Sequence, residues 1–228
     1  MCGRFTQHSG PTRYVQQFSR DWADAHVPNA PARYNIAPTQ DALVLRRHPE
    51  TGLAALSMLR WGLVPRWAKD LSFGARTINA RAETVAGAPA FRGAWGGKRR
   101  CVVPVDAFYE WLPGSKPKQP HAIAHADSTP LALAGLWDGW QDPGTGAWVR
   151  SFTILTCAAN PFMARLHDRM PVILPQAEVR PWLEGTGGTE LLVPYVADDL
   201  TAWPVSTRLN SPRNEGEDLI APTAPLPG

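Results

Sequence analysis

Cys2 is the residue with the most distinctive chemistry in this sequence. A small side chain after the initiator methionine normally leads to removal of that methionine, so we expect Cys2 to carry the free α-amine. The reference pKa values, about 8 for the α-amine and about 8.5 for the thiol, make both groups partly nucleophilic at neutral pH. Such a 1,2-aminothiol closes an aldehyde into a thiazolidine ring, whereas its thiol attacking an amide gives an acyl-enzyme. The alternative is an ordinary residue near a processed terminus.

A carboxylate inside an apolar and aromatic run is the second feature. Glu110 lies between Tyr109 and Trp111, so in a strand its side chain points away from theirs. It is either a surface residue of an edge strand or a buried acid with a raised pKa, which suits proton transfer. The spacing alone leaves both interpretations open.

Two further polar positions are candidates. Asn79 begins the polar run 79–84, which is a helix start, a polar turn or part of a functional cluster. His167 is of the residue type best suited to move protons near neutral pH, although a lone histidine is more often structural.

The cysteines and histidines give no metal signature. The three cysteines lie far apart without CxxC spacing, so we predict neither a zinc site nor a disulfide framework. This use of cysteine suits a reducing cytoplasm. His121 and His125 are four residues apart, but the sequence between them favours a strand, which excludes a helical metal pair. We therefore predict no metal and no cofactor.

Composition favours a globular protein. The 228 residues are 44% hydrophobic and 19% charged, and no apolar run approaches the roughly 18 residues of a membrane span. No secretory leader is visible, so we expect no membrane association. The net charge of +3 is too small to indicate nucleic-acid binding by itself. Arginine outnumbers lysine 19 to 4, which suits phosphate binding but equally reflects a high-GC genome.

The expected elements are short. Helical spacing predicts a helix over 12–25, and residues 28–39 read as an ordered loop. Strands are predicted at 42–46, 53–61, 101–105, 108–111, 121–124, 131–136, 148–156, 172–174 and 191–193. Short helices are predicted at 161–166, 177–183 and 198–203. This pattern indicates one α+β domain over 2–220, built on a mixed or antiparallel sheet curled toward a barrel with short flanking helices, and a frayed proline-rich tail at 221–228.

Six motifs occur in one order along the chain. They are residues 1–5, 34–40, 60–65, 79–84, 108–111 and 167–171, continued by 204–206 and Asn210. Each is weak alone, but together they resemble the SOS-response-associated peptidase (SRAP) family of abasic-site-processing proteins, from residue 2 to about residue 220. One departure is Ala107, where a glycine often precedes the aromatic pair; this change is expected to spare Glu110.

The resemblance implies covalent capture of abasic sites in single-stranded DNA. The open-chain aldehyde of such a site would react with Cys2 to form a thiazolidine cross-link that protects the lesion from strand cleavage. Glu110 matches the family's acid/base glutamate. His167 matches the histidine that assists opening of the sugar ring and, in reverse, release. Asn79 matches the asparagine that holds the terminus and the sugar.

The resemblance also implies a DNA path. Phosphate contacts would come from Arg4, Arg81 and Arg169, with Arg92 as a further candidate. Pro38 and Trp67 would line the strand, with Trp67 stacking on a base. We expect a cytoplasmic monomer, associated with the nucleoid when bound to DNA.

Two rival functions stay open. An N-terminal-nucleophile amidohydrolase also uses a first-residue cysteine and its own α-amine, and it would release ammonia from glutamine. A non-catalytic module for modified or single-stranded DNA would leave Cys2 structural, so that Cys2→Ser retains every activity.

Overall fold

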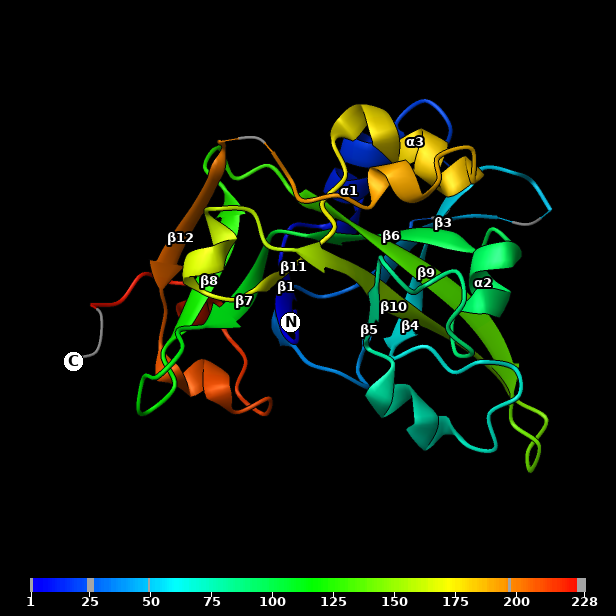
Figure 1. Ribbon diagram of the computed structural model, residues 1–228, viewed down its shortest axis with the longest axis horizontal. Helices are drawn as coiled ribbons and strands as arrows, with labels where there is room; N and C mark the ends of the chain where they lie inside the picture. The colour runs from blue at the N-terminus through cyan, green and yellow to red at the C-terminus, as the bar shows by residue number, and fades with distance from the viewer. Residues whose placement is uncertain (1, 24–26, 49, 197, 225–228) are drawn as a thin grey trace.

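The computed structural model describes residues 2–23, 27–48, 50–196 and 198–224. Its strands form two sheets, and the first is antiparallel with the order β12-β8-β7-β1-β2 (Figure 1). The bounds of these strands are β1 Phe5–Gln7, β2 Arg33–Ile36, β7 Ala107–Trp111, β8 Pro120–His125 and β12 Leu200–Pro204. This sheet carries the N-terminal segment in its interior, between β7 and β2.

The second sheet closes on itself. Its order is β11-β10-β4-β3-β6-β9, and β9 pairs back with β10, while β5 adds to β10. The bounds are β3 Asp41–Arg47, β4 Ala54–Trp61, β5 Asn79–Arg81, β6 Arg100–Val105, β9 Leu131–Gln141, β10 Trp148–Ala158 and β11 Arg169–Pro171. The pairs β10–β4 and β10–β5 are parallel and the others antiparallel. The predicted α+β class with a mixed, curled sheet is therefore confirmed.

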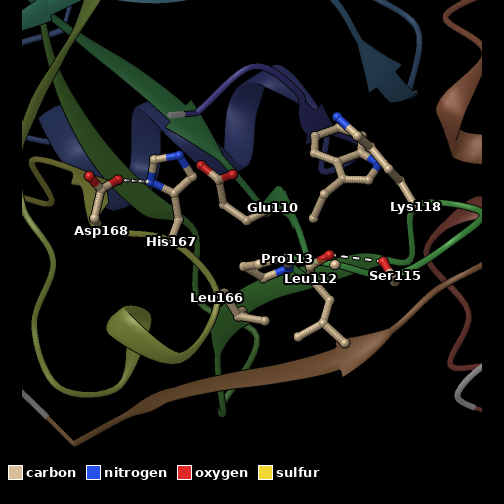
Figure 2. A pocket seen from close by; sticks show the side chains of 10 residues that line it. Glu110, Leu112, Pro113, Ser115, Lys118, Leu166, His167 and Asp168 are labelled. Carbon is tan, nitrogen blue, oxygen red and sulfur yellow. Dashed lines mark hydrogen bonds and ion pairs between the residues drawn. The ribbon is translucent and has the colours of Figure 1, made fainter. Parts of the chain in front are cut away.

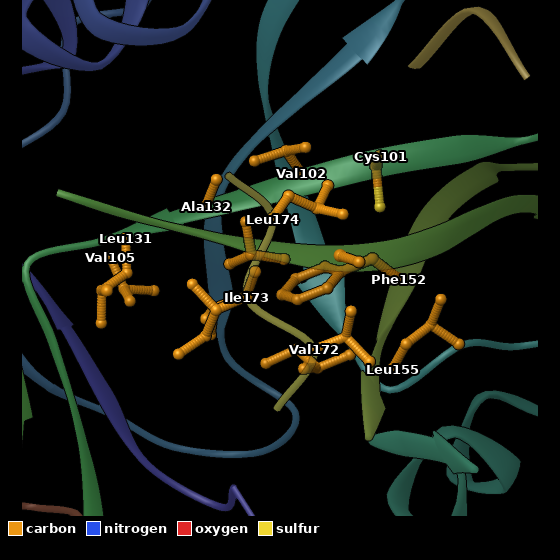
Figure 3. Packing of buried hydrophobic residues seen from close by; sticks show 14 of the residues in the cluster. Cys101, Val102, Val105, Leu131, Ala132, Phe152, Leu155, Val172, Ile173 and Leu174 are labelled. Atoms are coloured by element: carbon orange, nitrogen blue, oxygen red, sulfur yellow. The ribbon is translucent and has the colours of Figure 1, made fainter. Parts of the chain in front are cut away.

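The main core lies between the strands of the closed sheet. Cys101, Val102, Phe152 and Leu155 pack there with the segment 172–174 (Figure 3). Strand β6 is buried along its whole length, because helix α3 covers the sheet beside it and Trp182 Nε1 donates a hydrogen bond to the carbonyl of Cys101 (2.9 Å).

The helices are short and lie outside the sheets. Helix α1 spans Pro11–Ser19, α2 Arg92–Gly96 and α3 Gln176–Glu184. The 3-10 segments are η1 Leu71–Arg76, η2 Met163–Arg165, η3 Thr189–Leu191, η4 Thr207–Asn210 and η5 Glu217–Leu219. Helix α1 has proline at its first position and packs against α3. It ends before the predicted residue 25, and residues 24–26 lie outside the described part of the chain.

Four predicted segments are wrong. Residues 28–39, predicted as a loop, contain strand β2. In the predicted strand at 172–174, Ile173 makes one isolated bridge to Leu133 outside the named strands. The predicted helix at 198–203 is strand β12 from Leu200, because residues 200–204 pair with β8 and sheet pairing overrides local propensity. The predicted strand at 191–193 is instead the last residue of η3, Leu191, followed by a loop.

The C-terminal segment is joined to β12 at Thr223. Thr223 N–H donates to the carbonyl of Pro204 (2.9 Å), and residues 225–228 lie outside the described residues. The domain boundary at 220 remains a prediction.

A close approach of two glycines shapes the segment that follows β4. Gly62 has φ +117°, and a Cβ there would lie 2.3 Å from the carbonyl oxygen of Gly74. The contact folds residues 62–78 back on themselves, so that β5 starts beside β10. Asn79 therefore occupies its position because glycine stands at both places.

The described residues contain no helix that is both long and apolar enough to cross a membrane. Nor do they contain a group of three or more His, Cys, Asp or Glu side chains placed to hold a metal ion.

Candidate active site

The pairing of β1 with β7 places Cys2 near Glu110. Phe5 lies opposite Phe108, and the N–H of Tyr109 donates to the carbonyl of Arg4 (2.9 Å). The two strands are antiparallel, so the chain that precedes Phe5 runs along Glu110 toward Trp111. The register of β1 against β7 thus brings Cys2 close to Glu110, although the two are 108 residues apart in the sequence.

The Cys2 side chain is completely buried. Burial raises the pKa of the Cys2 thiol far above its ordinary value, and the negative charge of Glu110 raises it further. The thiol is therefore protonated at neutral pH in this environment. Glu110, whose charge contributes to this rise in pKa, lies on strand β7, which pairs with β1.

Asn79 holds the Cys2 backbone from the other sheet. Its Nδ2 donates a hydrogen bond of 2.8 Å to the carbonyl oxygen of Cys2. Its Oδ1 is buried and has no hydrogen-bond partner among the described residues. The amide thus fixes position 2 with one end and leaves an acceptor at the other.

Glu110 and His167 line one cavity of about 610 Å³ (Figure 2). The Glu110 carboxylate points toward the His167 ring, with Asp168 beyond the ring and Lys118 on the other side of the carboxylate. Glu110 is only 3% exposed. Burial raises the pKa of its carboxyl, and the positive charge of His167 opposes that rise. Of the two interpretations left open by the sequence, the structure selects the buried acid.

His167 lies between η2 and β11, where two groups face its Nδ1. The Asp168 carboxylate lies 2.8 Å from this nitrogen, and the backbone N–H of Arg169 points at it from 2.9 Å. The nitrogen carries either a proton or a lone pair, so only one of these contacts is a hydrogen bond at a time. The Asp168 contact belongs to a ring that carries a proton on Nδ1, and the Arg169 contact belongs to a ring whose Nδ1 has a lone pair.

Arg4 and Pro38 share a second cavity of about 510 Å³, next to the first. Arg4 is only 9% exposed, and its Nη1 donates to Asn35 Oδ1 (2.6 Å) and to the carbonyl of Leu209 (2.9 Å). Arg4 therefore forms part of the cavity wall and has little freedom to move.

Arg81 and Arg169 flank the end of β10 from opposite sides. Arg81 is exposed. Arg169 makes a two-pronged ion pair with Glu83, with Nη1–Oε1 2.5 Å and Nη2–Oε2 3.0 Å, and its Nη2 also donates to the carbonyl of Thr156 (2.7 Å). Any phosphate that approaches Arg169 therefore meets the Glu83 carboxylate as well.

Trp67 is 58% exposed, with its ring edge-to-face against Phe73 and its Nε1 directed at the carbonyl of Pro89 (3.3 Å). The ring is thus supported from one side and open on the other. Arg92 is exposed at the start of α2, and no side-chain hydrogen bond or ion pair within the described chain joins it to the other candidates.

The structure adds residues that the sequence patterns did not single out. Lys118 lines both cavities, and Glu83 neutralises Arg169. A lysine in a loop that also contains Lys116 gives no periodic signal, and Glu83 was visible only as a member of the run 79–84.

The comparisons with known proteins lead to one family. The family model described as "SOS response associated peptidase (SRAP)" matches residues 1–212. The abasic site processing protein YoaM of Bacillus subtilis is 41% identical over 226 residues, covering 96% of this chain and 97% of that protein. The abasic site processing protein YedK of Escherichia coli is 30% identical over 231 residues, covering 97% of this chain and 100% of that protein. A crystal structure from Bacteroides thetaiotaomicron has the same fold, with a TM-score of 0.83 at 23% identity over 98% of this chain and 100% of that one. The chain belongs to the SRAP family.

Proposed function

We propose that this protein processes abasic sites by capturing their ring-opened aldehyde, in single-stranded DNA, as a thiazolidine cross-link to Cys2. The hydrogen bond from Asn79 Nδ2 to the Cys2 carbonyl carries this proposal. A reacting first residue must be held in place beside its acid, and this hydrogen bond holds Cys2. Removal of Met1 is part of the proposal, since the chemistry requires a free amine on Cys2.

The amine acts first in this reaction. It attacks the aldehyde carbon, a C–N bond forms, and the resulting hydroxyl leaves as water after it receives a proton. Glu110 supplies that proton, which fits its raised carboxyl pKa. The thiol then adds to the carbon of the protonated imine, and its proton returns to Glu110, which leaves the ring nitrogen neutral. The net reaction joins protein and sugar with release of one water, without oxidation or reduction.

His167 and Asn79 act on the sugar. An abasic site is mostly a closed hemiacetal, so a proton must be moved for the ring to open. His167 shares the cavity with Glu110 and is placed to move that proton. The buried Oδ1 of Asn79 accepts a hydrogen bond from the incoming amine or from a sugar hydroxyl.

The DNA is held around this site. Pro38 and Trp67 line the strand path, with Arg81, Arg92 and Arg169 as phosphate contacts. Arg4 was also predicted to contact a phosphate, but it is held in the cavity wall by its hydrogen bonds to Asn35 and Leu209. Affinity for undamaged strands is modest, because the net charge is only +3. It falls with salt, because the contacts to phosphates release counterions. We further propose that the protein acts as a monomer in the cytoplasm.

The test is covalent capture. The purified protein is mixed with a single strand that contains one abasic site, made from uracil by uracil glycosylase, and resolved on a denaturing gel. We expect a slow-migrating species that is absent with an undamaged strand and with Cys2→Ala. Cys157→Ser is the matched control, because it also removes a buried thiol but leaves the first residue intact.

Other outcomes of these experiments support one of the two alternative functions. With loss of Met1 confirmed by mass spectrometry, absence of the shifted species overturns the proposal. Ammonia release from glutamine then indicates an amidohydrolase. Full activity of Cys2→Ser indicates a binding module.

A further inference from the structure

We propose that Lys118 binds a phosphodiester next to the abasic sugar, with the flanking nucleotide in the cavity lined by Arg4, Pro38 and Trp111. This inference rests on the proposed function and adds a residue to it. Lys118 lines both that cavity and the one that contains Glu110 and His167. It therefore stands at the passage between the reacting group and its neighbour.

A hydrogen-bonded network holds this wall in place. Trp111 Nε1 donates to Asn210 Oδ1 (2.7 Å), and Asn210 Nδ2 donates to the carbonyl of Lys118 (3.0 Å). Asn210 thereby ties the loop after β7 to η4, although these segments are 92 residues apart. The backbone at Lys118 is fixed while its side chain remains exposed.

The charges around the two cavities favour a phosphate at Lys118. Arg4 is buried and already donates to two oxygens. In the described part of the chain, no carboxylate lies within ion-pair distance of the Lys118 ammonium. Glu110 and Asp168 lie on the other side of the first cavity (Figure 2). A phosphodiester is therefore repelled from the Asp168 side and attracted to Lys118.

The size of the second cavity suits the flanking residue. Its volume of about 510 Å³ is within the usual range of small-molecule sites, about 300–1,000 Å³. The half-buried Trp111 indole lies in its wall, with the Arg4 guanidinium 5.8 Å from the ring centroid. These planar groups tolerate any base, which suits a protein that must follow lesions through all sequences.

The experiment measures the rate of cross-linking against DNA concentration for the wild type, Lys118→Ala and Lys118→Arg. Lys116→Ala is the matched control, because Lys116 is exposed in the same loop and lines neither cavity. For Lys118→Ala we expect the half-saturating DNA concentration to rise about three- to tenfold while the maximal rate changes less than about twofold. Lys118→Arg keeps most of the wild-type affinity. In Lys118→Ala, the slope of log affinity against log salt concentration becomes shallower by about 0.7.

A second arm locates the phosphate. A neutral methylphosphonate replaces, in turn, each of the two linkages that flank the abasic sugar. At one of them the substitution weakens the wild type but leaves Lys118→Ala unchanged. Equal behaviour of Lys118→Ala and Lys116→Ala, in a wild type that does cross-link, overturns this inference alone. Absence of any cross-link in the wild type overturns the proposed function as well.

Discussion

Replacing Glu83 by glutamine is expected to strengthen binding of single-stranded DNA while it weakens the fold. Glu83 holds Arg169 through two hydrogen bonds, and it is 52% exposed against 17% for Arg169. The glutamine keeps the shape of the side chain but removes its charge. Arg169 then becomes available to a phosphate.

The magnitudes follow from this geometry. Partly exposed ion pairs contribute about 0.2–1 kcal/mol, and the two-pronged arrangement places this one near the upper end, so the free energy of unfolding falls by about 1 kcal/mol. A phosphate on the far side of the guanidinium lies roughly 6 Å from the carboxylate, where one unit charge in water repels it by roughly 0.7 kcal/mol. Removal of that repulsion raises affinity about threefold. One additional phosphate contact steepens the salt slope by about 0.7.

Fluorescence anisotropy with an undamaged strand, measured over a series of salt concentrations, gives the affinity, and urea unfolding gives the stability. Glu184→Gln is the matched control, because it removes one charge and one ion pair, with Arg180, on α3. In an Arg169→Ala background the substitution at Glu83 has no further effect on the salt slope. Unchanged or weaker DNA binding by Glu83→Gln, with the control at the wild-type value, refutes the reasoning.

Three further changes test the site and its support. Asn79→Ala slows single-turnover cross-linking at least about tenfold, while the free energy of unfolding measured in urea falls by about 1 kcal/mol. An unchanged rate contradicts a role for the hydrogen bond from Asn79 to Cys2. Glu110→Gln matches the wild type in stability near pH 4 and exceeds it at higher pH. The reason is that the pKa of Glu110 is raised in the folded state, so the wild type is most stable while this carboxyl is protonated. That contribution to the free energy of unfolding is lost as the pH rises through the folded-state pKa. Parallel urea-stability curves for the two proteins against pH exclude this. Gly62→Ala costs about 3 kcal/mol or more because its Cβ meets the Gly74 carbonyl, whereas Gly87→Ala, with nothing within 4 Å, is nearly neutral in the same assay.

The sequence predicted most strands because their apolar runs are bounded by turn residues, as in β3 and β4. It also predicted a curled mixed sheet, which the pairing of β9 with β10 confirms. It failed at β12, whose short segment carries no signal stronger than its pairing with β8. Local pattern determines which residues can form a strand, and only the tertiary structure determines which of the ambiguous ones do.

The candidate site divides in the same way. The chemistry of Cys2 and the carboxyl of Glu110 are visible in the sequence, but their adjacency depends on the register of β1 against β7. The contact from Asn79 depends on two glycines twelve residues apart that meet in space. Lys118 and Glu83 are ordinary charged residues in any one-dimensional pattern. Their roles arise from the groups that the fold brings next to them.

Burial of the Cys2 thiol bears on the order of steps in the proposed reaction. A thiol whose pKa is raised by desolvation and by Glu110 is a poor nucleophile toward amides, which weakens the case for acyl-enzyme chemistry. It is still well suited to close a ring onto an imine formed on its own residue, because that step is intramolecular and needs no free thiolate beforehand. The same desolvation raises the pKa of Glu110, which favours the protonated carboxyl that the proposed loss of water requires. A single buried environment thus disfavours one reaction of the aminothiol and favours the other.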